Sequence, residues 1–181
     1  LDLRPVRTKR LRDNAHTIGN LRITQFSESV PKRVEEALQE LKEKEVEGLI
    51  LDLRNNSGGL VSSGIAVADS LLSEKPVVET KDRNGIKDAI ISQKETSFDG
   101  PMVTLVNKGT ASASEILAGS LQDNERSILM GEQTYGKGLI QSLKSLGEDS
   151  GIAITVASYL TPDGNNIQGQ GITPDKLLDL P

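Results

Sequence analysis

The chain has 181 residues, of which 35% are hydrophobic and 26% charged, a composition typical of one globular domain with its own core. Its net charge of −5 argues against nucleic acid as a main partner, because phosphate binding requires a basic face. Cysteine is absent and histidine occurs once, which excludes a disulfide framework, a cysteine nucleophile and a histidine cluster for zinc. No apolar run approaches the roughly 20 residues of a membrane span.

The start of the chain is predicted to be an extended polar lead-in. Arg and Lys outnumber Asp and Glu in residues 1–20, and we expect a free, solvated basic strand there rather than a binding element. The chain shows no signal peptide and does not begin with methionine, so we expect a mature form or a fragment of a longer chain. Apolar and polar residues then alternate in residues 21–26, as in a half-buried strand.

A helix followed by a buried strand is predicted next. The helix begins near Ser29, with Pro31 in its first turn, where the missing N–H costs little, and it ends by Gly48. Its apolar face is formed by Val34, Ala37, Leu38 and Leu41. The nearly continuous apolar run 49–53 indicates a central strand covered on both faces. A strand, a helix and a strand in this order favour a right-handed crossover.

A glycine pair separates this strand from a second predicted helix. The strand ends in the sequence Arg-Asn-Asn-Ser-Gly-Gly of residues 54–59. The helix that follows carries an apolar stripe of Val61, Ile65, Ala68 and Leu72. Gly58 and Gly59 could free backbone N–H groups to point at a ligand oxygen, or they could simply make a tight turn.

A hairpin, a second buried strand and a third helix follow. Residues 76–92 are predicted to form a hairpin outside the main sheet, because Asn84-Gly85 favours a turn with positive φ. The apolar run 102–106 indicates a buried strand, and residues 113–123 a helix whose N-terminus would favour a developing negative charge.

Ser112 and Lys137 are the candidate nucleophile and general base. Ser112 lies among small residues at the start of the third helix, and Lys137 lies between Gly136 and Gly138, 25 residues later. A serine hydroxyl needs a neighbour that takes its proton, and a lysine can do so only when a pocket keeps its amine neutral. The small residues would let the two side chains approach and admit a substrate backbone. The sequence Ser112-Ala113-Ser114-Glu115 equally fits a helix capping box.

The segment around Lys137 also raises a nucleotide-binding alternative. Residues 131–138 are one residue short of a phosphate-binding loop, but Gly138 replaces the hydroxyl residue that would hold magnesium. The following residues 139–146 alternate like a strand, whereas a phosphate loop opens a helix.

Gln141 is a candidate partner of the lysine amine. In a strand the side chains of Lys137 and Gln141 share one face, so Gln141 could orient the amine or simply be exposed. Two more strand-like runs, 152–157 and 159–162, follow.

Four segments, in this order, resemble the carboxyl-terminal processing (tail-specific) serine peptidases. They are the runs Leu-Asp-Leu-Arg-Asn-Asn-Ser-Gly-Gly of residues 51–59, Gly-Thr-Ala-Ser-Ala-Ser-Glu of 109–115, Gly-Glu-Gln-Thr-Tyr-Gly-Lys-Gly of 131–138 and the segment 159–175. The resemblance implies an α/β fold with a mixed β-sheet flanked by helices, similar to Clp protease and crotonase, with a peripheral hairpin.

The resemblance also implies roles for individual residues. Ser112 and Lys137 would form the catalytic dyad, and Gln141 would assist the lysine. The backbone N–H of Ala113 and that of Gly58 or Gly59 would form the oxyanion hole. The chain departs from the family pattern where Ser57 replaces a proline and Asn165 an arginine. In the resembling family an aspartate at the position of Asp123 is often associated with the active site, but we expect a structural role for it in this chain.

The implied function is endopeptidase cleavage of a protein near its C-terminus through an acyl-enzyme, with no metal or other cofactor. The implied partner is a protein or peptide with a free C-terminus, and no nucleic acid is expected. Residues 21–181 would be the peptidase core, the lead-in 1–20 would come from a missing upstream module, and the full-length protein would carry a PDZ module. The expected location is the bacterial envelope or the chloroplast lumen. The alternative is a non-catalytic ligand- or peptide-binding module on the same scaffold.

Overall fold

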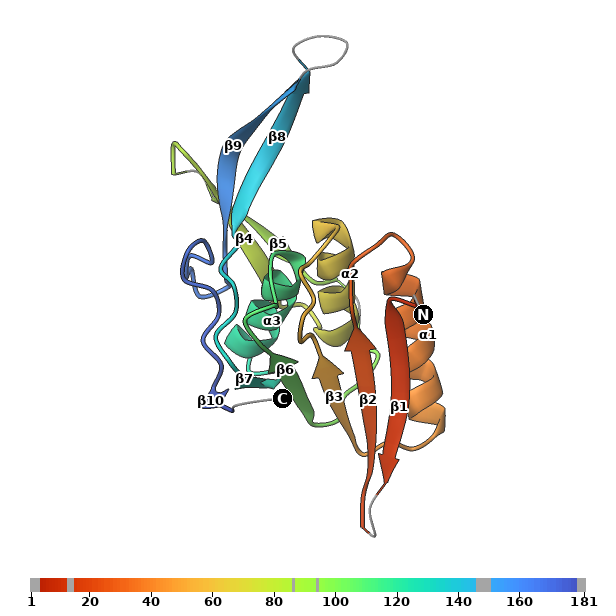
Figure 1. The fold of residues 1–181 in the computed structure, drawn as a ribbon. Coiled ribbons are helices and arrows are strands. Elements are labelled where there is room, and N and C mark those ends of the chain that lie inside the picture. The colour runs from red at the N-terminus through yellow and green to blue at the C-terminus, as the bar shows by residue number, and fades with distance from the viewer. Residues whose placement is uncertain (1–3, 13–14, 86, 94, 146–150, 179–181) are drawn as a thin grey trace.

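The structure, a computed structural model, describes residues 4–12, 15–85, 87–93, 95–145 and 151–178. Its helices are α1 (Val30–Glu43), α2 (Val61–Leu71) and α3 (Ala113–Asp123). Its strands are β1 (Val6–Arg12), β2 (Thr17–Ile23), β3 (Gly48–Asp52), β4 (Pro76–Asp82), β5 (Lys87–Ile91), β6 (Met102–Val106), β7 (Ile128–Gly131), β8 (Leu139–Ser145), β9 (Gly151–Leu160) and β10 (Lys176–Leu177). The fold class is the predicted one, since helices pack on a mixed sheet and a hairpin lies outside it (Figure 1).

The main sheet has six strands in the order β1-β2-β3-β6-β7-β10. From β2 to β10 every neighbouring pair is parallel, and only β1 runs antiparallel to its neighbour. The apolar runs predicted as buried strands form β3 and β6, which lie side by side in the centre. Leu49, Leu51, Met102 and Val106 are buried there, whereas Ile50, Val103 and Leu105 on the other face are only partly buried. The two strands are therefore fully covered on one face only, whereas the apolar runs had predicted cover on both.

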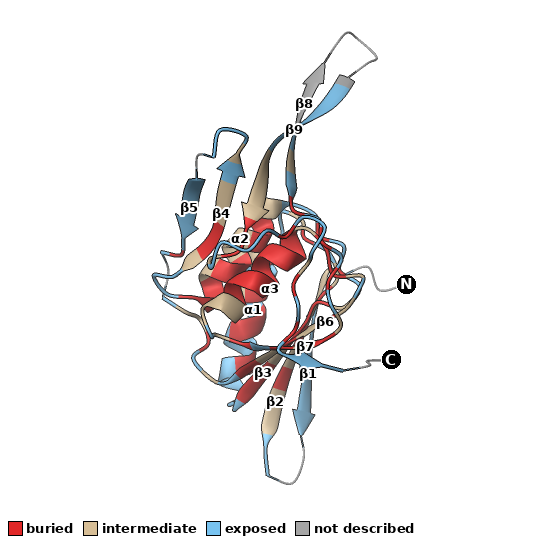
Figure 2. Cartoon of the chain, turned by 90° about the vertical axis from the view of Figure 1, so that its left-hand side faces the viewer, coloured by how far each residue is buried: buried red, intermediate tan, exposed pale blue. Residues whose placement is uncertain are grey.

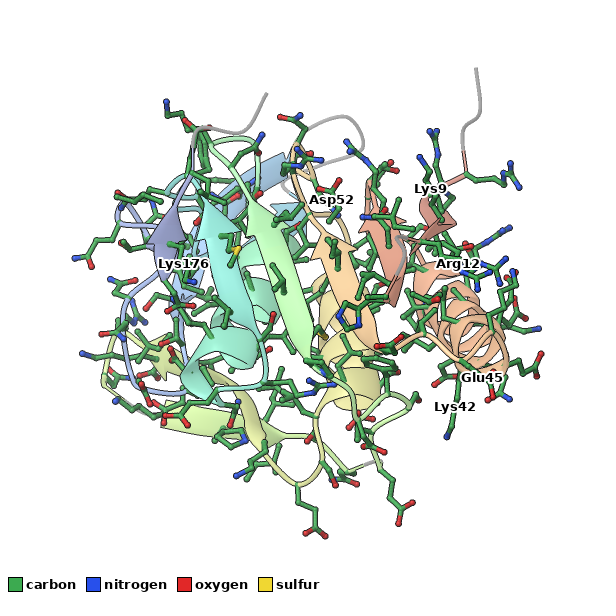
Figure 3. All side chains as sticks on the ribbon, turned by 90° about the horizontal axis from the view of Figure 1, so that it is seen from below. Lys9, Arg12, Lys42, Glu45, Asp52 and Lys176 are labelled. Atoms are coloured by element: carbon green, nitrogen blue, oxygen red, sulfur yellow. The ribbon has the colours of Figure 1, made fainter. Side chains whose placement is uncertain are left out.

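The predicted lead-in extends the main sheet. β1 pairs with β2 along its whole length, from Val6 opposite Ile23 to Arg12 opposite Thr17, and β2 begins four residues before the predicted strand at residue 21. The basic side chains therefore belong to an edge strand rather than to a free one. Figure 3 shows Lys9 and Arg12 at this outer edge, beside α1. Charged side chains on an edge strand discourage pairing with another chain.

The helices follow their predicted starts closely. α1 begins at Val30 after Ser29, with Pro31 in its first turn, and its predicted apolar face is buried. α2 differs in part, because its buried side is centred on Val67, Ala68 and Leu71, while the predicted Val61 and Ile65 are only partly covered. α3 is buried all round from Ala113 to Leu121. None of the helices that the structure describes is long and apolar enough to cross a membrane.

A second, antiparallel sheet has the strand order β5-β4-β9-β8. The hairpin predicted at residues 76–92 forms β4 and β5 in this sheet, outside the main one as expected. The two strand-like runs after residue 151 form the single strand β9. Figure 2 shows α2 and α3 between β4 and the main sheet, where most buried residues gather, and Figure 1 shows β8 and β9 projecting from the body. The core therefore lies between the two sheets.

Candidate active site

Three loops meet at the carboxyl ends of the central strands. β3 leads into residues 53–60, β6 into residues 107–112 and β7 into residues 132–138. Because these strands are adjacent and parallel, the loops that follow them lie along the same edge of the sheet. This order of strands brings the glycine pair, the candidate serine and the candidate lysine into one region.

Ser112 is held in a strained backbone conformation between β6 and α3. Its φ of 57° and ψ of −118° fall in a region that non-glycine residues rarely adopt. Such strain costs on the order of 1–3 kcal/mol and is concentrated at functional sites. The predicted capping box between Ser112 and Glu115 is present, and the Glu115 N–H also donates to the carbonyl oxygen of Ser112 at 2.8 Å. The box does not exclude a role as nucleophile, because Ser112 is half-buried at the start of α3.

Glu115 connects the serine turn to the lysine loop. Its fully buried carboxylate accepts the backbone N–H groups of Ser112 (2.9 Å) and Lys137 (2.8 Å) on Oε2. Oε1 accepts the Thr134 hydroxyl (2.5 Å) and the Gly136 N–H (2.6 Å). The capping-box pattern identified only the bond to Ser112. The other three come from a loop about 20 residues away, which local spacing does not reveal.

The lysine loop is also bound directly to its neighbours. The Tyr135 N–H donates to the Thr110 carbonyl oxygen at 3.0 Å, and the Gly169 N–H donates to the Gly136 carbonyl oxygen at 2.9 Å. A Cβ atom on Gly138 would lie 2.7 Å from the backbone nitrogen of Gln168. The glycines around Lys137 therefore allow residues 167–171 to pack against the loop. From the sequence we expected these glycines to make room for a substrate backbone. In the structure they make room for residues 167–171 of the same chain.

The structure distinguishes between the two glycines of the predicted oxyanion hole. The Gly58 N–H donates to Asn56 Oδ1 at 3.0 Å, so it is already engaged. Neither the Gly59 N–H nor the Ala113 N–H donates to any other described residue. Gly58 has another role, because a Cβ atom there would lie 2.8 Å from the Cβ of Ser112. It lets the glycine turn approach the serine.

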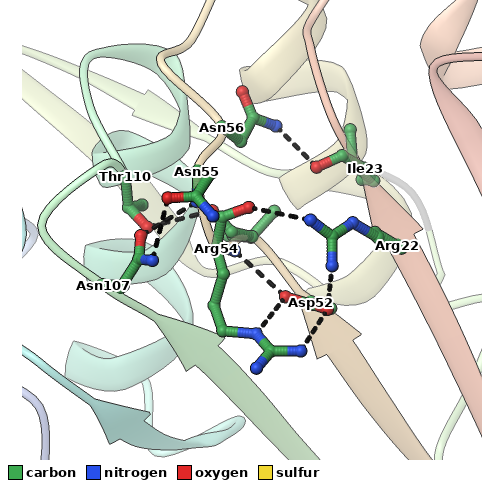
Figure 4. A network of polar contacts seen from close by, with 9 residues as sticks. Arg22, Ile23, Asp52, Arg54, Asn55, Asn56, Asn107 and Thr110 are labelled. Atoms are coloured by element: carbon green, nitrogen blue, oxygen red, sulfur yellow. Dashed lines mark hydrogen bonds and ion pairs between the residues drawn. The ribbon is translucent and has the colours of Figure 1, made fainter. Parts of the chain in front are cut away.

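Asn56 holds the glycine turn in place. Its buried amide nitrogen donates to the Ile23 carbonyl oxygen at 2.9 Å, as Figure 4 shows. Its own carbonyl oxygen accepts the Ala111 N–H and the Ser114 hydroxyl, each at 3.0 Å. Through its side chain and its backbone carbonyl together, Asn56 thus joins β2 to the start of α3. Sequence reasoning missed this residue, although an asparagine pair after a buried strand is a recognisable signal.

An ion network around the buried Asp52 lies below the same turn (Figure 4). Asp52 accepts hydrogen bonds from Arg22 at 2.9 Å and from the Arg54 guanidinium at 2.9 Å through both Nε and Nη2. Burial raises the pKa of Asp52, but the hydrogen bonds from Arg54 and the charges of both arginines outweigh it, so the pKa lies below its usual value. The carboxylate therefore stays ionised and fixes the end of β3.

A cavity of about 540 Å³ lies beside the serine turn. It is lined by Ser57, Gly109, Ala111, Tyr135, Gly136, Lys137, Leu139, Gln141 and Gln168. Lys137 and Gln141 thus line one cavity, and both residues are exposed. Regular strand alternation is not the reason, because Lys137 precedes β8 and the register of β8 shifts between Ile140 and Gln141. No hydrogen bond among the described residues joins the Lys137 amine to Ser112 or to Gln141. The structure thus places Ser112, Lys137 and Gln141 in one region, but it shows no hydrogen bond between their described side chains.

Two sequence-based alternatives can be decided here. The phosphate-loop alternative is wrong, because Gly138 is followed by β8 and not by a helix. Asp123 has the structural role expected, since its carboxylate accepts the Asp163 N–H at 2.9 Å. It ends α3, roughly 16 Å along the helix from Ser112 at 1.5 Å per residue. In the part of the chain that the structure describes, no three His, Asp or Glu residues cluster as metal ligands would.

Comparison with known proteins matches the chain to one family. The sequence profile of Peptidase family S41 matches residues 17–178. A carboxyl-terminal-processing protease of Synechocystis sp. is 50% identical over 165 residues, which are 91% of this chain and 39% of that protein. A chloroplastic C-terminal processing peptidase of Tetradesmus obliquus is 45% identical over 164 residues, covering 90% of this chain and 35% of that protein.

Solved structures agree with these matches. The structure of a photosystem II D1 C-terminal processing protease superposes with a TM-score of 0.92 at 39% identity, covering 99% of this chain and 49% of that one. The tricorn protease, at 19% identity and a TM-score of 0.54, shares the fold alone. The chain spans less than half the length of the curated relatives described above.

Proposed function

Because the chain belongs to peptidase family S41, we propose that it acts as a serine endopeptidase with Ser112 as nucleophile and Lys137 as general base. The observation that carries this proposal is the shared bond to Glu115, which ties the two residues' backbones to one carboxylate oxygen. The strained turn at Ser112 supports it independently, because backbone strain of this kind is concentrated at functional sites and the turn places the serine at the start of a helix.

The reaction proceeds in two halves. The neutral amine of Lys137 takes the proton from the Ser112 hydroxyl while the oxygen attacks the scissile carbonyl carbon. The lysine then returns the proton to the leaving amine, and an acyl-enzyme remains on Ser112. A water molecule then attacks the acyl carbon and gives its proton to the lysine. The bond from the acyl carbon to the Ser112 oxygen breaks as the lysine returns this proton to the serine, which releases the acid and restores both residues. Gln141 lines the same cavity, and its proposed role is to orient the amine through a hydrogen bond that forms when substrate binds.

Two backbone N–H groups stabilise the negative oxygen that forms during each attack. The unengaged N–H groups of Ala113 and Gly59 are the favoured donors, since the Gly58 N–H is bound to Asn56. Each donor of this kind contributes about 2.7–4 kcal/mol to lowering the barrier. Ala113 is also the first residue of α3, and the helix dipole favours negative charge at that end.

Substrate binding completes the site. The Lys137 side chain is exposed in the free protein, whereas a base of this kind must be kept from water to remain neutral. A peptide lying in the 540 Å³ cavity covers the amine and excludes water from it. The dyad therefore forms fully only with substrate bound.

The names of the relatives indicate the substrate class and location. Both curated relatives described above are named for C-terminal processing, and one is chloroplastic. We infer cleavage near the C-terminus of a protein substrate, in an extracytoplasmic or lumenal compartment. The relatives are more than twice as long as this chain, which leaves room for the expected PDZ module.

The test compares hydrolysis of an unstructured peptide with a free C-terminus by the wild type and single variants. Ser112→Ala removes the nucleophile and Lys137→Ala removes the base, and we expect kcat/KM to fall by roughly 10²-fold to 10⁴-fold or more. Lys108→Ala is the matched control, because Lys108 is an exposed lysine on a neighbouring loop, paired with Glu132. Equal cleavage rates in Ser112→Ala and wild type, with both folded, would exclude the dyad, and absence of cleavage by the folded wild type would favour the non-catalytic binding module.

A further inference from the structure

Gln168 lies in the loop that packs against the lysine segment, and it lines the same cavity as Lys137 and Gln141. Its Oε1 accepts the Gly138 N–H at 3.0 Å. Its backbone is fixed as well, because the Gln168 N–H donates to Asn166 Oδ1 at 3.0 Å. The side chain is thus held by the residue that directly follows the candidate base.

This bond determines the orientation of the carboxamide. A backbone N–H can only donate, so the atom that faces Gly138 must be the oxygen. The Nε2 group, with two N–H donors, then makes no hydrogen bond to any residue that the structure describes. A planar amide held at one end presents these donors in a fixed direction rather than sampling many.

The cavity is rich in donors and lacks carboxylates. Among the described residues that line it there is no Asp or Glu, whereas Ser57, Lys137, Gln141 and Gln168 all carry donor groups. Its apolar lining comes from Ala111, Leu139 and the ring of Tyr135. Such a surface suits a ligand that offers carbonyl oxygens between apolar side chains, which is the pattern of an extended peptide.

From these contacts we infer that Gln168 is a substrate-binding residue, whose Nε2 group donates to a backbone carbonyl of a peptide bound in extended form beside the scissile bond. The inference rests on the proposed peptidase function and specifies how its substrate is held. Recognition of a backbone carbonyl is independent of the substrate side chain, so Gln168 supports binding of unfolded segments of varied sequence. The bond to Gly138 couples this contact to the position of Lys137.

Two substitutions separate substrate binding from support of the lysine loop. Gln168→Ala removes both the bond to Gly138 and the donor. Gln168→Glu retains an oxygen for the Gly138 N–H but replaces the Nε2 donor with an acceptor. Gln170→Ala is the matched control, because Gln170 is an exposed glutamine of the same loop that lines a different cavity, with Asp123 and Thr161.

Binding is measured at fixed pH in the Ser112→Ala background, by the anisotropy of a labelled peptide that the wild type cleaves. One hydrogen bond of this kind corresponds to a change in Kd of roughly 3-fold to 10-fold. We expect that loss in both Gln168 variants and less than about 2-fold in Gln170→Ala. Binding by Gln168→Glu equal to that of the parent, with Gln168→Ala weakened, would overturn the inference and leave Gln168 as a support of the loop.

A second peptide with an amidated C-terminus identifies the acceptor. A backbone carbonyl predicts the same loss for the amidated and the free-acid peptide, whereas a loss confined to the free acid would place the C-terminal carboxylate at Gln168 and contradict the assignment. If the wild type cleaves peptides but both Gln168 variants bind like their parent, the inference alone fails. If the wild type cleaves none, the proposed function fails, and the inference with it.

Discussion

Ser112 and Lys137 donate their backbone N–H groups to the same atom, Oε2 of Glu115, at 2.9 and 2.8 Å. The relative position of the two loops therefore depends on one buried carboxylate. Because both side chains extend from backbone atoms that are held by a common partner, a small displacement of Glu115 moves the candidate nucleophile and base relative to each other.

Glu115→Gln should impair both stability and activity. The amide weakens charge-assisted hydrogen bonds to Ser112, Thr134, Gly136 and Lys137, and it turns an N–H₂ group toward N–H donors. We expect the free energy of unfolding in urea to fall by about 3 kcal/mol and kcat/KM to fall at least roughly 100-fold. The exposed Glu125→Gln, at the other end of α3, is the control and should leave both values unchanged. A fully active Glu115→Gln would contradict the proposed role.

Asn56→Asp should destabilise the glycine turn although its shape is conserved. The aspartate can still accept the Gly58 N–H, but it cannot donate to the Ile23 carbonyl oxygen, so a buried acceptor loses its partner. The expected loss in unfolding free energy is about 1–3 kcal/mol, measured by urea unfolding. Asn55→Asp provides the comparison, because Asn55 is exposed and its side-chain oxygen accepts from Asn107. We expect Asn55→Asp to cost clearly less than Asn56→Asp.

Gly138→Ala should reduce activity by moving the lysine loop. The new methyl group would lie 2.7 Å from the backbone nitrogen of Gln168 and 2.9 Å from the Ile167 Cβ, so residues 167–171 must move away. A displacement of about 1 Å near the reacting groups can reduce kcat/KM roughly 100-fold. Gly85→Ala is the control, since Gly85 has a positive φ but nothing within 4 Å of an added Cβ, and lies in the turn after β4. It should lower thermal stability without changing kcat/KM.

The Asp52 network should make stability depend on pH in acid. The folded-state pKa of Asp52 lies below its unfolded-state value of about 3.9, so ionised Asp52 stabilises the fold above that pH. This contribution is lost as the pH falls through the lower folded-state pKa. We expect Asp52→Asn to be less stable than wild type at pH 7, with the difference in urea unfolding free energy shrinking below about pH 4.

The exposed Asp88→Asn on β5 serves as the control for this titration and should follow the wild-type curve. A constant difference between Asp52→Asn and wild type from pH 7 to strongly acidic conditions would show that the carboxylate contributes through packing rather than through its charge.

The sequence alone determined the local elements and the residues that carry chemistry. α1 begins at its predicted cap with the predicted apolar face, and β3 and β6 occupy the predicted apolar runs. The small residues around Ser112 indicated a turn into a helix, which the structure contains. These features depend on side-chain spacing within one element, so a short window of sequence contains the information.

The tertiary structure decided how these pieces meet. The order β3-β6-β7 places three loops side by side, and only then does Glu115 reach Lys137, while Asn56 occupies the Gly58 N–H and leaves that of Gly59 unengaged. The pairing of β1 with β2, which places the basic lead-in at the edge of the sheet, is also a contact that only the tertiary structure decided. Each of these contacts depends on which strands become neighbours. Strand order results from packing of the whole core, which the spacing within any one segment does not encode.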